Sequence, residues 1–244
     1  AGRHLEPTAS SSARPMKQII AMHGWAGHAG LWNHWRRMLE PQGWVWQSAE
    51  RGYGPAPLDM PQWHSTAGER VVIAHSLGLH LLPENQLKDA TAVVLLGCFT
   101  TFAEAGTAGR ATRAGLQGMR AALGSTSEQN MLRKFLEKAS APLSVDAFPP
   151  FPVLEPLSDS GRNRLNDDLG LLESCRQLPM SWPRQARVLV VRGMKDAVVS
   201  AACHQQLLDA LSNQTIQVHC DPSSGHALIT PRVLRIVDQW LQIP

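Results

Sequence analysis

Three residues that could act together in nucleophilic catalysis stand where predicted strands end. Ser76 follows the apolar run 71–74 in the pattern Ala-His-Ser-Leu-Gly, and Asp196 and His226 each lie in a loop after a later strand. A serine hydroxyl is a weak nucleophile until a histidine accepts its proton, and an acidic side chain must orient that histidine. The chain order serine, aspartate, histidine is typical of a nucleophile on a strand–turn–helix motif. The sequence therefore predicts Ser76 as nucleophile, His226 as base and Asp196 as orienting acid.

The residues around Ser76 are small, as such a turn requires. A strand and a helix approach closely at this turn, so bulky side chains two positions before or after the serine would clash. Gly78 meets this requirement, whereas Ala74 adds one methyl group where glycine is usual. The alternative is structural: Ser76 and Asp196 would only cap helices, and His226 would be an ordinary loop histidine.

Predicted strands and helices alternate around these three loops. Strands are predicted at 18–22, 44–49, 71–74, 91–96, 188–191 and 215–220, and helices at 31–39, 79–82, 207–211 and 233–241. This alternation predicts an α/β fold, with a mostly parallel sheet and helices on both of its faces. Because ligands bind at the carboxyl edge of such sheets, we expect the three candidate residues to meet there.

An ester carbonyl that is attacked by Ser76 would develop a negative charge, which needs two fixed backbone donors. The Leu77 amide is one candidate, because it directly follows the nucleophile at the start of a helix. The second donor is expected in the glycine-rich turn after the first strand, at Trp25. His23 in the same turn is expected to brace the backbone.

A long segment without strand patterns lies between the strands at 91–96 and 188–191. Helical patterns occur within it at 103–123, 128–139 and 166–177. Five prolines between residues 142 and 156 exclude a regular helix there. We therefore expect a helical lid over 99–182, inserted into an α/β core of 16–98 and 183–244.

Composition limits the class of protein. Of the 244 residues, 43% are hydrophobic and 18% are charged, which fits one large folded domain. A net charge of +3 gives no reason to expect nucleic-acid binding, and no apolar run is long enough to cross a membrane. The cysteines lack the paired spacing of a metal site and indicate free thiols. We expect a cytoplasmic monomer that uses neither a metal nor an organic cofactor.

Residues 1–15 are polar and contain no apolar segment of the kind that secretory signals have. Met16 directly precedes the first apolar strand. We therefore expect 1–15 to be a tail or a cloning remnant, with Met16 as the natural start.

Six short stretches match the pattern of one known family. They are Met22-His23-Gly24-Trp25, Ser76-Leu77-Gly78, Gly97-Cys98-Phe99-Thr100, Arg133-Lys134-Phe135-Leu136, Asp168-Leu169-Gly170-Leu171-Leu172 and Leu178-Pro179. With them the chain resembles the α/β-hydrolase family from Met16 onward. Within that family it is similar to the pimeloyl-[acyl-carrier protein] methyl ester esterases of biotin synthesis, of the BioH and BioK types. The lid stretches carry the similarity to this subfamily, and the others are shared by many hydrolases.

The resemblance implies a substrate-binding wall and a partner. The substrate contacts that we predict are Trp25, Phe99, Phe135, Leu136, Lys138 and Ala139. An acyl carrier protein is acidic, so it would need a basic docking surface. The candidates for docking are Arg110, Arg113, Arg120, Arg133 and Lys134. The alternatives are that the aromatic residues are contacts between lid and sheet, and that the arginines form an ordinary solvated helix face.

The resulting hypothesis is a serine esterase that hydrolyses the methyl ester of pimeloyl-[acyl-carrier protein]. One alternative is a general short-chain carboxylesterase or a carbon–carbon bond hydrolase with the same three residues. Another is a receptor that binds ligands on a hydrolase scaffold without turning them over. A dehalogenase or an epoxide hydrolase is not expected, because those relatives have an aspartate where Ser76 stands.

Overall fold

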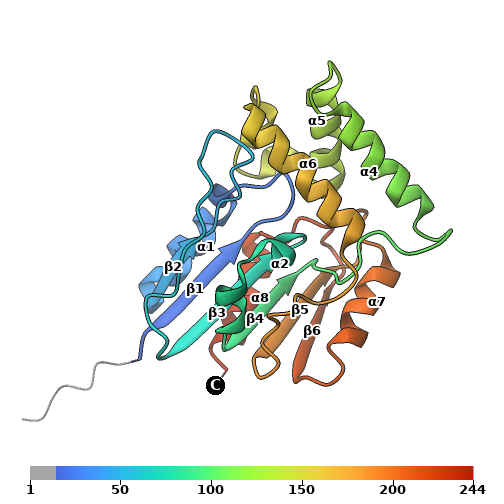
Figure 1. Cartoon of the computed structure of the whole chain (residues 1–244). Coiled ribbons are helices and arrows are strands. Elements are labelled where there is room, and N and C mark those ends of the chain that lie inside the picture. Colours follow the sequence, from blue (N-terminus) through green and yellow to red (C-terminus); the bar gives the residue numbers. More distant parts are fainter. Residues whose placement is uncertain (1–14, 244) are drawn as a thin grey trace, which may run out of the picture.

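A computed structural model describes residues 15–243 of the chain (Figure 1). The prediction about residues 1–15 therefore falls almost wholly outside the described residues. None of the described helices is both long enough and apolar enough to cross a membrane.

Six parallel strands form a single sheet in the order β2-β1-β3-β4-β5-β6. The strands are β1 Lys17–Met22, β2 Trp44–Ser48, β3 Glu69–His75, β4 Ala92–Leu96, β5 Arg187–Gly193 and β6 Ile216–Asp221. From β1 the chain first adds β2 on one side and then β3 on the other. This reversal opens a crevice beyond the carboxyl ends of β1 and β3, where sheets of this kind bind ligands. The fold class predicted from the sequence is confirmed.

Both faces of the sheet are buried, which explains why its strands are continuous apolar runs. Alternate side chains point to opposite faces, so Ile19 and Ala21 pack on one side and Ile20 and Met22 on the other. Helices α1 (Asn33–Leu39) and α8 (Pro231–Leu241) cover the first face. Helices α2 (Gly78–Leu81), α3 (Glu84–Lys88) and α7 (Ala201–Ala210) cover the second, with α2 in front of the sheet in Figure 1.

Three further helices gather above the carboxyl edge of the sheet and form a cap (Figure 1). They are α4 (Arg110–Ala122), α5 (Glu128–Ser140) and α6 (Asp159–Ser174). The proline-rich segment between α5 and α6 has only two short 3-10 turns, η3 (Val145–Ala147) and η4 (Pro152–Leu154). These helices and the segments that join them to the sheet, residues 99–182, make up the cap.

Several helices begin at other residues than the apolar patterns predict. Helices α6 and α7 begin earlier, because the side chains of Ser158 and Ser200 accept amides of the first turn. Thr230 caps α8 in the same way. Helix α4 begins only at Arg110, since Arg113 donates to backbone carbonyls of the preceding loop and holds that loop outside the helix.

Candidate active site

Ser76 stands on a tight turn between β3 and α2. Its φ angle of 55° lies in the left-handed region, which a side chain other than glycine adopts at a cost. A Cβ atom at Gly78 would lie 2.6 Å from the Met22 carbonyl oxygen, so a side chain there would separate this turn from β1. At position 74, where glycine is usual, alanine is accommodated because its methyl group is fully buried in the core. The turn thus has the nucleophile-elbow geometry with alanine at its first small position.

The structure brings Ser76, His226 and Asp196 into one hydrogen-bonded row. The Ser76 hydroxyl lies 2.9 Å from His226 Nε2, and His226 Nδ1 lies 2.9 Å from Asp196 Oδ2. The residues come from the loops after β3, β5 and β6, which end at the same edge of the sheet. Ser76 and His226 are 7% and 2% exposed, so the row is shielded from bulk water. With Nδ1 protonated, His226 Nε2 is free to accept the serine proton.

The loops that carry Asp196 and His226 are joined to each other through the backbone. The Lys195 amide donates to the Ser224 carbonyl at 3.0 Å, and the Met194 amide donates to the Asp221 carbonyl at 2.9 Å. A Cβ atom at Gly193 would lie 2.0 Å from the Gly225 carbonyl oxygen, so only glycine permits this approach. The pair of loops therefore forms one unit that fixes the distance between carboxylate and imidazole.

The Asp196 carboxylate is buried and ionised. Its Oδ1 accepts the amides of Val198 and Val199 at 2.8 and 2.9 Å. Burial alone would raise the pKa of Asp196, but the charge of His226 and hydrogen bonds from His204, His226 and the backbone hold this pKa well below its usual range. Asp196 can therefore keep its negative charge while His226 takes up a proton.

His75, directly before Ser76, was not predicted as a site residue from the sequence. Its Nε2–H donates to the His226 carbonyl at 2.9 Å, and the two rings lie 5.1 Å apart. Burial, with a further contribution from the charge of His226, lowers the pKa of His75 to about 3. His75 is therefore neutral at physiological pH and ties the His226 loop to β3.

The two predicted oxyanion donors lie beside Ser76. Leu77 is fully buried at the start of α2, and Trp25 lies in the turn after β1. The backbone amides of both residues donate to no backbone carbonyl of the described chain. A Cβ atom at Gly24 would lie only 2.9 Å from Ser76 Cβ, which shows how closely this turn approaches Ser76. His23 donates through Nδ1 to the Gly24 carbonyl at 2.9 Å and so braces the turn.

A cavity opens directly onto Ser76 and His226. About 520 Å³ of space there is not filled by protein atoms, a volume that includes open solvent outside the mouth of the cavity. Most of its wall is apolar and comes from both the core and the cap: Trp25, Leu31, Phe135, Leu136, Ala139, Phe148, Phe151, Ala227 and Ile229. The polar side chains among the described lining residues are His75, Ser76, Ser140 and His226. Since none of these lining residues is an aspartate, glutamate, lysine or arginine, the cavity suits an uncharged chain.

Two of the predicted substrate contacts, Phe99 and Lys138, do not line this cavity. Phe99 is fully buried below the cavity, where its ring stacks on His80 at 5.6 Å and contacts Phe102 at 5.1 Å. Lys138 is exposed on α5. The cavity face of α5 carries Phe135, Leu136, Ala139 and Ser140, which share one face because of their helical spacing. The predicted residues Trp25, Phe135, Leu136 and Ala139 do lie in the wall.

Sequence reasoning missed part of the cavity wall. Phe148 and Phe151 lie in the proline-rich segment, which has no periodicity to show which side chains point inward. Leu31 and Ile229 also line the cavity, although their local patterns suggested only helix and loop. The prolines of this segment indicated a fixed, irregular backbone, but they did not indicate which of its side chains face the cavity.

A buried polar cluster joins the core to the cap. Arg51, in the loop after β2, binds both carboxylate oxygens of Asp168 on α6 at 2.7 and 2.8 Å. Tyr53 donates to the same carboxylate at 2.5 Å. Burial, followed by the charge of Asp168, raises the pKa of Tyr53 well above its usual value. The Trp25 indole adds a bond of 2.9 Å to the Leu165 carbonyl on α6.

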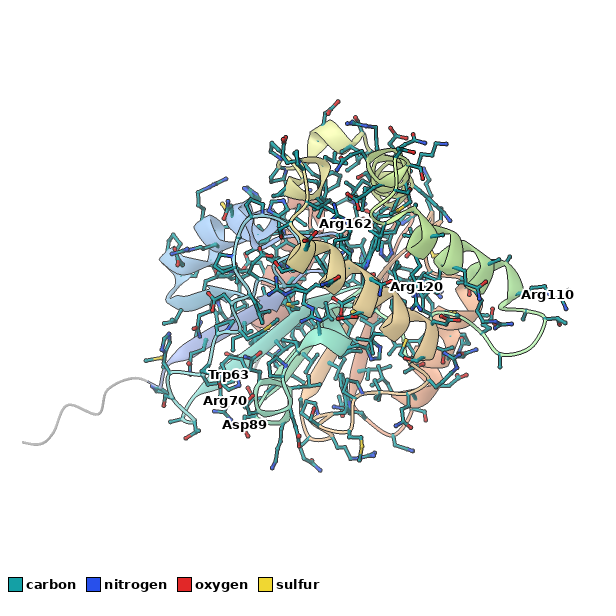
Figure 2. All side chains as sticks on the ribbon, turned by 45° about the horizontal axis from the view of Figure 1, so that its top comes forward. Trp63, Arg70, Asp89, Arg110, Arg120 and Arg162 are labelled. Atoms are coloured by element: carbon teal, nitrogen blue, oxygen red, sulfur yellow. The ribbon has the colours of Figure 1, made fainter. Side chains whose placement is uncertain are left out.

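The arginines predicted to dock a partner have different surroundings. Figure 2 shows Arg110 at the outer end of α4, whereas Arg120 lies toward α6 and pairs with Glu173 at 3.8 Å. Arg113 is bonded to the loop before α4. Arg133 and Lys134 are exposed on α5. Among the predicted docking residues, Arg110, Arg133 and Lys134 thus make neither an ion pair nor a side-chain hydrogen bond within the described chain.

The described residues contain no cluster of His, Cys, Asp or Glu side chains that could hold a metal. The cysteines are free thiols, and Cys98, Cys175 and Cys203 are buried. Burial raises the pKa of Cys98 far above its usual value, which makes this thiol unreactive.

The chain matches no protein-family model and no curated protein sequence. Its structure is similar to many solved structures. An esterase from Exiguobacterium antarcticum has 12% identity and a TM-score of 0.69 over 92% of this chain and 90% of that one. MenH from S. aureus has 10% identity and a TM-score of 0.62 over 96% of both chains.

The bottromycin epimerase BotH is also similar, with 11% identity and a TM-score of 0.62 over 93% of this chain and 90% of that one. The chain has the α/β-hydrolase fold. Because an epimerase shares this fold with an esterase, the fold alone does not fix the reaction.

Proposed function

We propose that this chain is a serine esterase that hydrolyses the methyl ester of pimeloyl-[acyl-carrier protein], as in biotin synthesis. The observation that carries the esterase part is the hydrogen-bonded row of Ser76, His226 and Asp196 at the base of an apolar cavity. The apolar cavity wall and the sequence resemblance of the cap support the choice of substrate. Exposed Arg110, Arg133 and Lys134 supply positive charge on the cap for an acidic carrier protein.

In the proposed reaction, His226 Nε2 takes the proton of Ser76, and Ser76 Oγ attacks the ester carbonyl carbon. The amides of Leu77 and Trp25 stabilise the resulting oxyanion. The tetrahedral intermediate collapses, the carbon–oxygen bond to the methoxy group breaks, and His226 protonates the departing methanol. Water then adds to the acyl-enzyme with His226 as base, which releases the carboxylate and restores Ser76.

An uncharged cavity explains why the enzyme would act on an ester and release an acid. The substrate methyl ester is neutral and can enter an apolar site at little desolvation cost, whereas the product carboxylate finds no cation in the described wall. Hydrolysis therefore converts a ligand that suits the cavity into one that does not. This difference favours release of the product.

A short-chain carboxylesterase is the second candidate. The observation that favours it is the cavity itself, whose neutral wall would also accept small esters. The two candidates differ in whether the cap recognises a carrier protein. A small ester would not need the cationic surface of α4 and α5.

The deciding experiment compares turnover of pimeloyl-carrier-protein methyl ester with turnover of p-nitrophenyl butyrate. Wild type and Ser76→Ala are assayed beside a double variant, Arg110→Glu with Lys134→Glu, and a control, Arg37→Glu, at an exposed position of α1. We expect fast turnover of the carrier-bound ester, loss of all activity in Ser76→Ala, and a loss confined to the carrier-bound ester in the double variant.

Two results would contradict the proposal. Turnover of the small ester alone would establish the short-chain carboxylesterase instead. Binding of ligands without turnover of either ester would favour a receptor on the hydrolase scaffold.

A further inference from the structure

A second histidine reaches the candidate acid from outside the row. His204 lies on α7, and its Nε2 is 3.3 Å from Asp196 Oδ2, the same oxygen that His226 Nδ1 contacts at 2.9 Å. The side chains of His204 and Asp196 are only 6% and 2% exposed. This contact is therefore a buried one, made to the group on which the orientation of His226 depends.

The other hydrogen bonds to Asp196 show that His204 is the donor in its contact with the carboxylate. Oδ1 already accepts the amides of Val198 and Val199, and Oδ2 accepts Nδ1–H of His226. An ionised carboxylate has about four acceptor positions and no proton to give. His204 must therefore donate from Nε2–H, and its bond fills the last acceptor position.

We propose that His204 is a positioning residue for the serine–histidine–aspartate row. Its hydrogen bond keeps the Asp196 carboxylate from rotating and withdraws charge from Oδ2, so that His226 stays aligned with Ser76. This inference rests on the proposed role of Ser76 as nucleophile, but not on any particular ester. His204 is not among the lining residues of the cavity, so its effect falls on the reaction step rather than on substrate binding.

Two variants distinguish the effect of the hydrogen bond on activity from the effect of the volume that the His204 ring fills. His204→Gln keeps an amide donor near the position of Nε2, whereas His204→Leu fills similar volume without a donor. We expect His204→Leu to lower kcat for p-nitrophenyl butyrate about tenfold with KM unchanged, since one buried hydrogen bond is lost. His204→Gln should recover most of that loss.

The pH profile of kcat/KM supplies a readout that packing alone would not move. The groups that face His226 are His75 from β3, Asp196 from the loop after β5, and Ser76. Without the donor of His204, Asp196 holds the His226 imidazolium more strongly. The acid limb of the profile should therefore move to higher pH in His204→Leu and stay in place in His204→Gln.

The rate at which a fluorophosphonate labels Ser76 tests the inference without a natural substrate. In this reaction the Ser76 Oγ–P bond forms, fluoride leaves, and His226 takes the serine proton. Labelling of the wild type without hydrolysis of the carrier-bound ester would refute the proposed substrate and leave this inference standing. Equal labelling rates and pH profiles in wild type and both variants would overturn the inference alone.

Folding of the variants is checked by thermal unfolding. If His204→Leu does not fold, His204→Asn replaces it, because the shorter asparagine amide does not reach Asp196 Oδ2. The inference would also be overturned if kcat fell equally in His204→Gln and in the variant without the donor, and if the acid limb did not shift. The His204 ring would then act by packing only.

Discussion

The loops at the carboxyl edge of the sheet and the cap above them are held by different kinds of interaction. In the loops, the candidate row is fixed by hydrogen bonds between backbone and side chains, such as the two amides on Asp196. In the cap, the helices are held mainly by a cluster of apolar side chains that includes Leu116, Leu132 and Leu169. Hydrogen bonds are directional, whereas apolar packing tolerates sliding.

Several polar contacts join the cap to the rest of the fold. The Asp168 cluster and the bond from Trp25 to Leu165 hold α6, and the Ala227 amide donates to the Ala139 carbonyl on α5 at 3.0 Å. The last contact places the cavity face of α5 next to His226. This arrangement separates the positions that would perform the reaction from those that would select the substrate.

The largest expected effect tests the row itself. Ser76→Ala should lower ester hydrolysis by ~10⁴-fold or more, because the nucleophile is lost while the surrounding loops remain. The measurement is kcat/KM for p-nitrophenyl butyrate, with thermal unfolding to check the fold. Cys98→Ser, which alters a buried group outside the row, is the control for effects on packing. Residual activity close to that of the wild type would show that another residue is the nucleophile.

The second test breaks the link between the cap and the loops. Asp168→Ala leaves the Arg51 cation and the buried Tyr53 hydroxyl without their acceptor, and should destabilise the protein by about 3 kcal/mol. Urea unfolding measures this change. The neighbouring Asp167 is exposed, so Asp167→Ala should have little effect. Equal stabilities of the two variants would mean that the Asp168 cluster does not hold the cap.

The third test concerns the pH dependence of stability that arises from His75, at the end of β3. The pKa of His75 is about 3 in the folded protein against an ordinary value of 6.5, so below pH 6.5 the unfolded chain binds a proton that the folded chain does not. Stability should therefore fall with decreasing pH below 6.5, by up to about 1.4 kcal/mol per pH unit from this group. His28, whose pKa burial lowers to about 4, adds to the slope.

Unfolding measured between pH 7 and pH 4.5 checks this expectation. His75→Asn should flatten the slope, whereas His64→Asn, at an exposed position, should not. Identical slopes in the two variants would contradict it. Asp196 and Asp221 also have lowered pKa values, but their stabilising contributions are lost only as the pH falls below 3.8.

The smallest expected effect tests the cap as the part that selects the substrate. Phe135 lies in the cavity wall, and its ring contacts Trp25 at 4.8 Å. Phe135→Ala should raise KM for long acyl esters about tenfold through lost apolar contact, with kcat little changed. Met180→Ala, at a cap residue that is 97% exposed, should have no effect. A fall in kcat without a change in KM would show that the cap also shapes the reaction step.

Local patterns were enough to predict the sheet, since apolar runs flanked by glycines mark buried parallel strands wherever they occur. They were also enough to bring Ser76, Asp196 and His226 together, because residues at the carboxyl ends of parallel strands share one edge. The helix starts were less well predicted, since caps such as Ser158 lie outside the apolar pattern.

The sequence by itself determined which strands form and where the candidate side chains Ser76, Asp196 and His226 stand, because strand ends and turn residues are encoded within a few positions. Only the tertiary structure decided which side chains line the cavity, as Phe148 and Phe151 show. It also paired Arg51 with Asp168, which lie 117 residues apart, and placed His204 on Asp196. Such contacts depend on how a helix or an irregular segment is rotated against the sheet, and the packing of the whole chain sets that rotation.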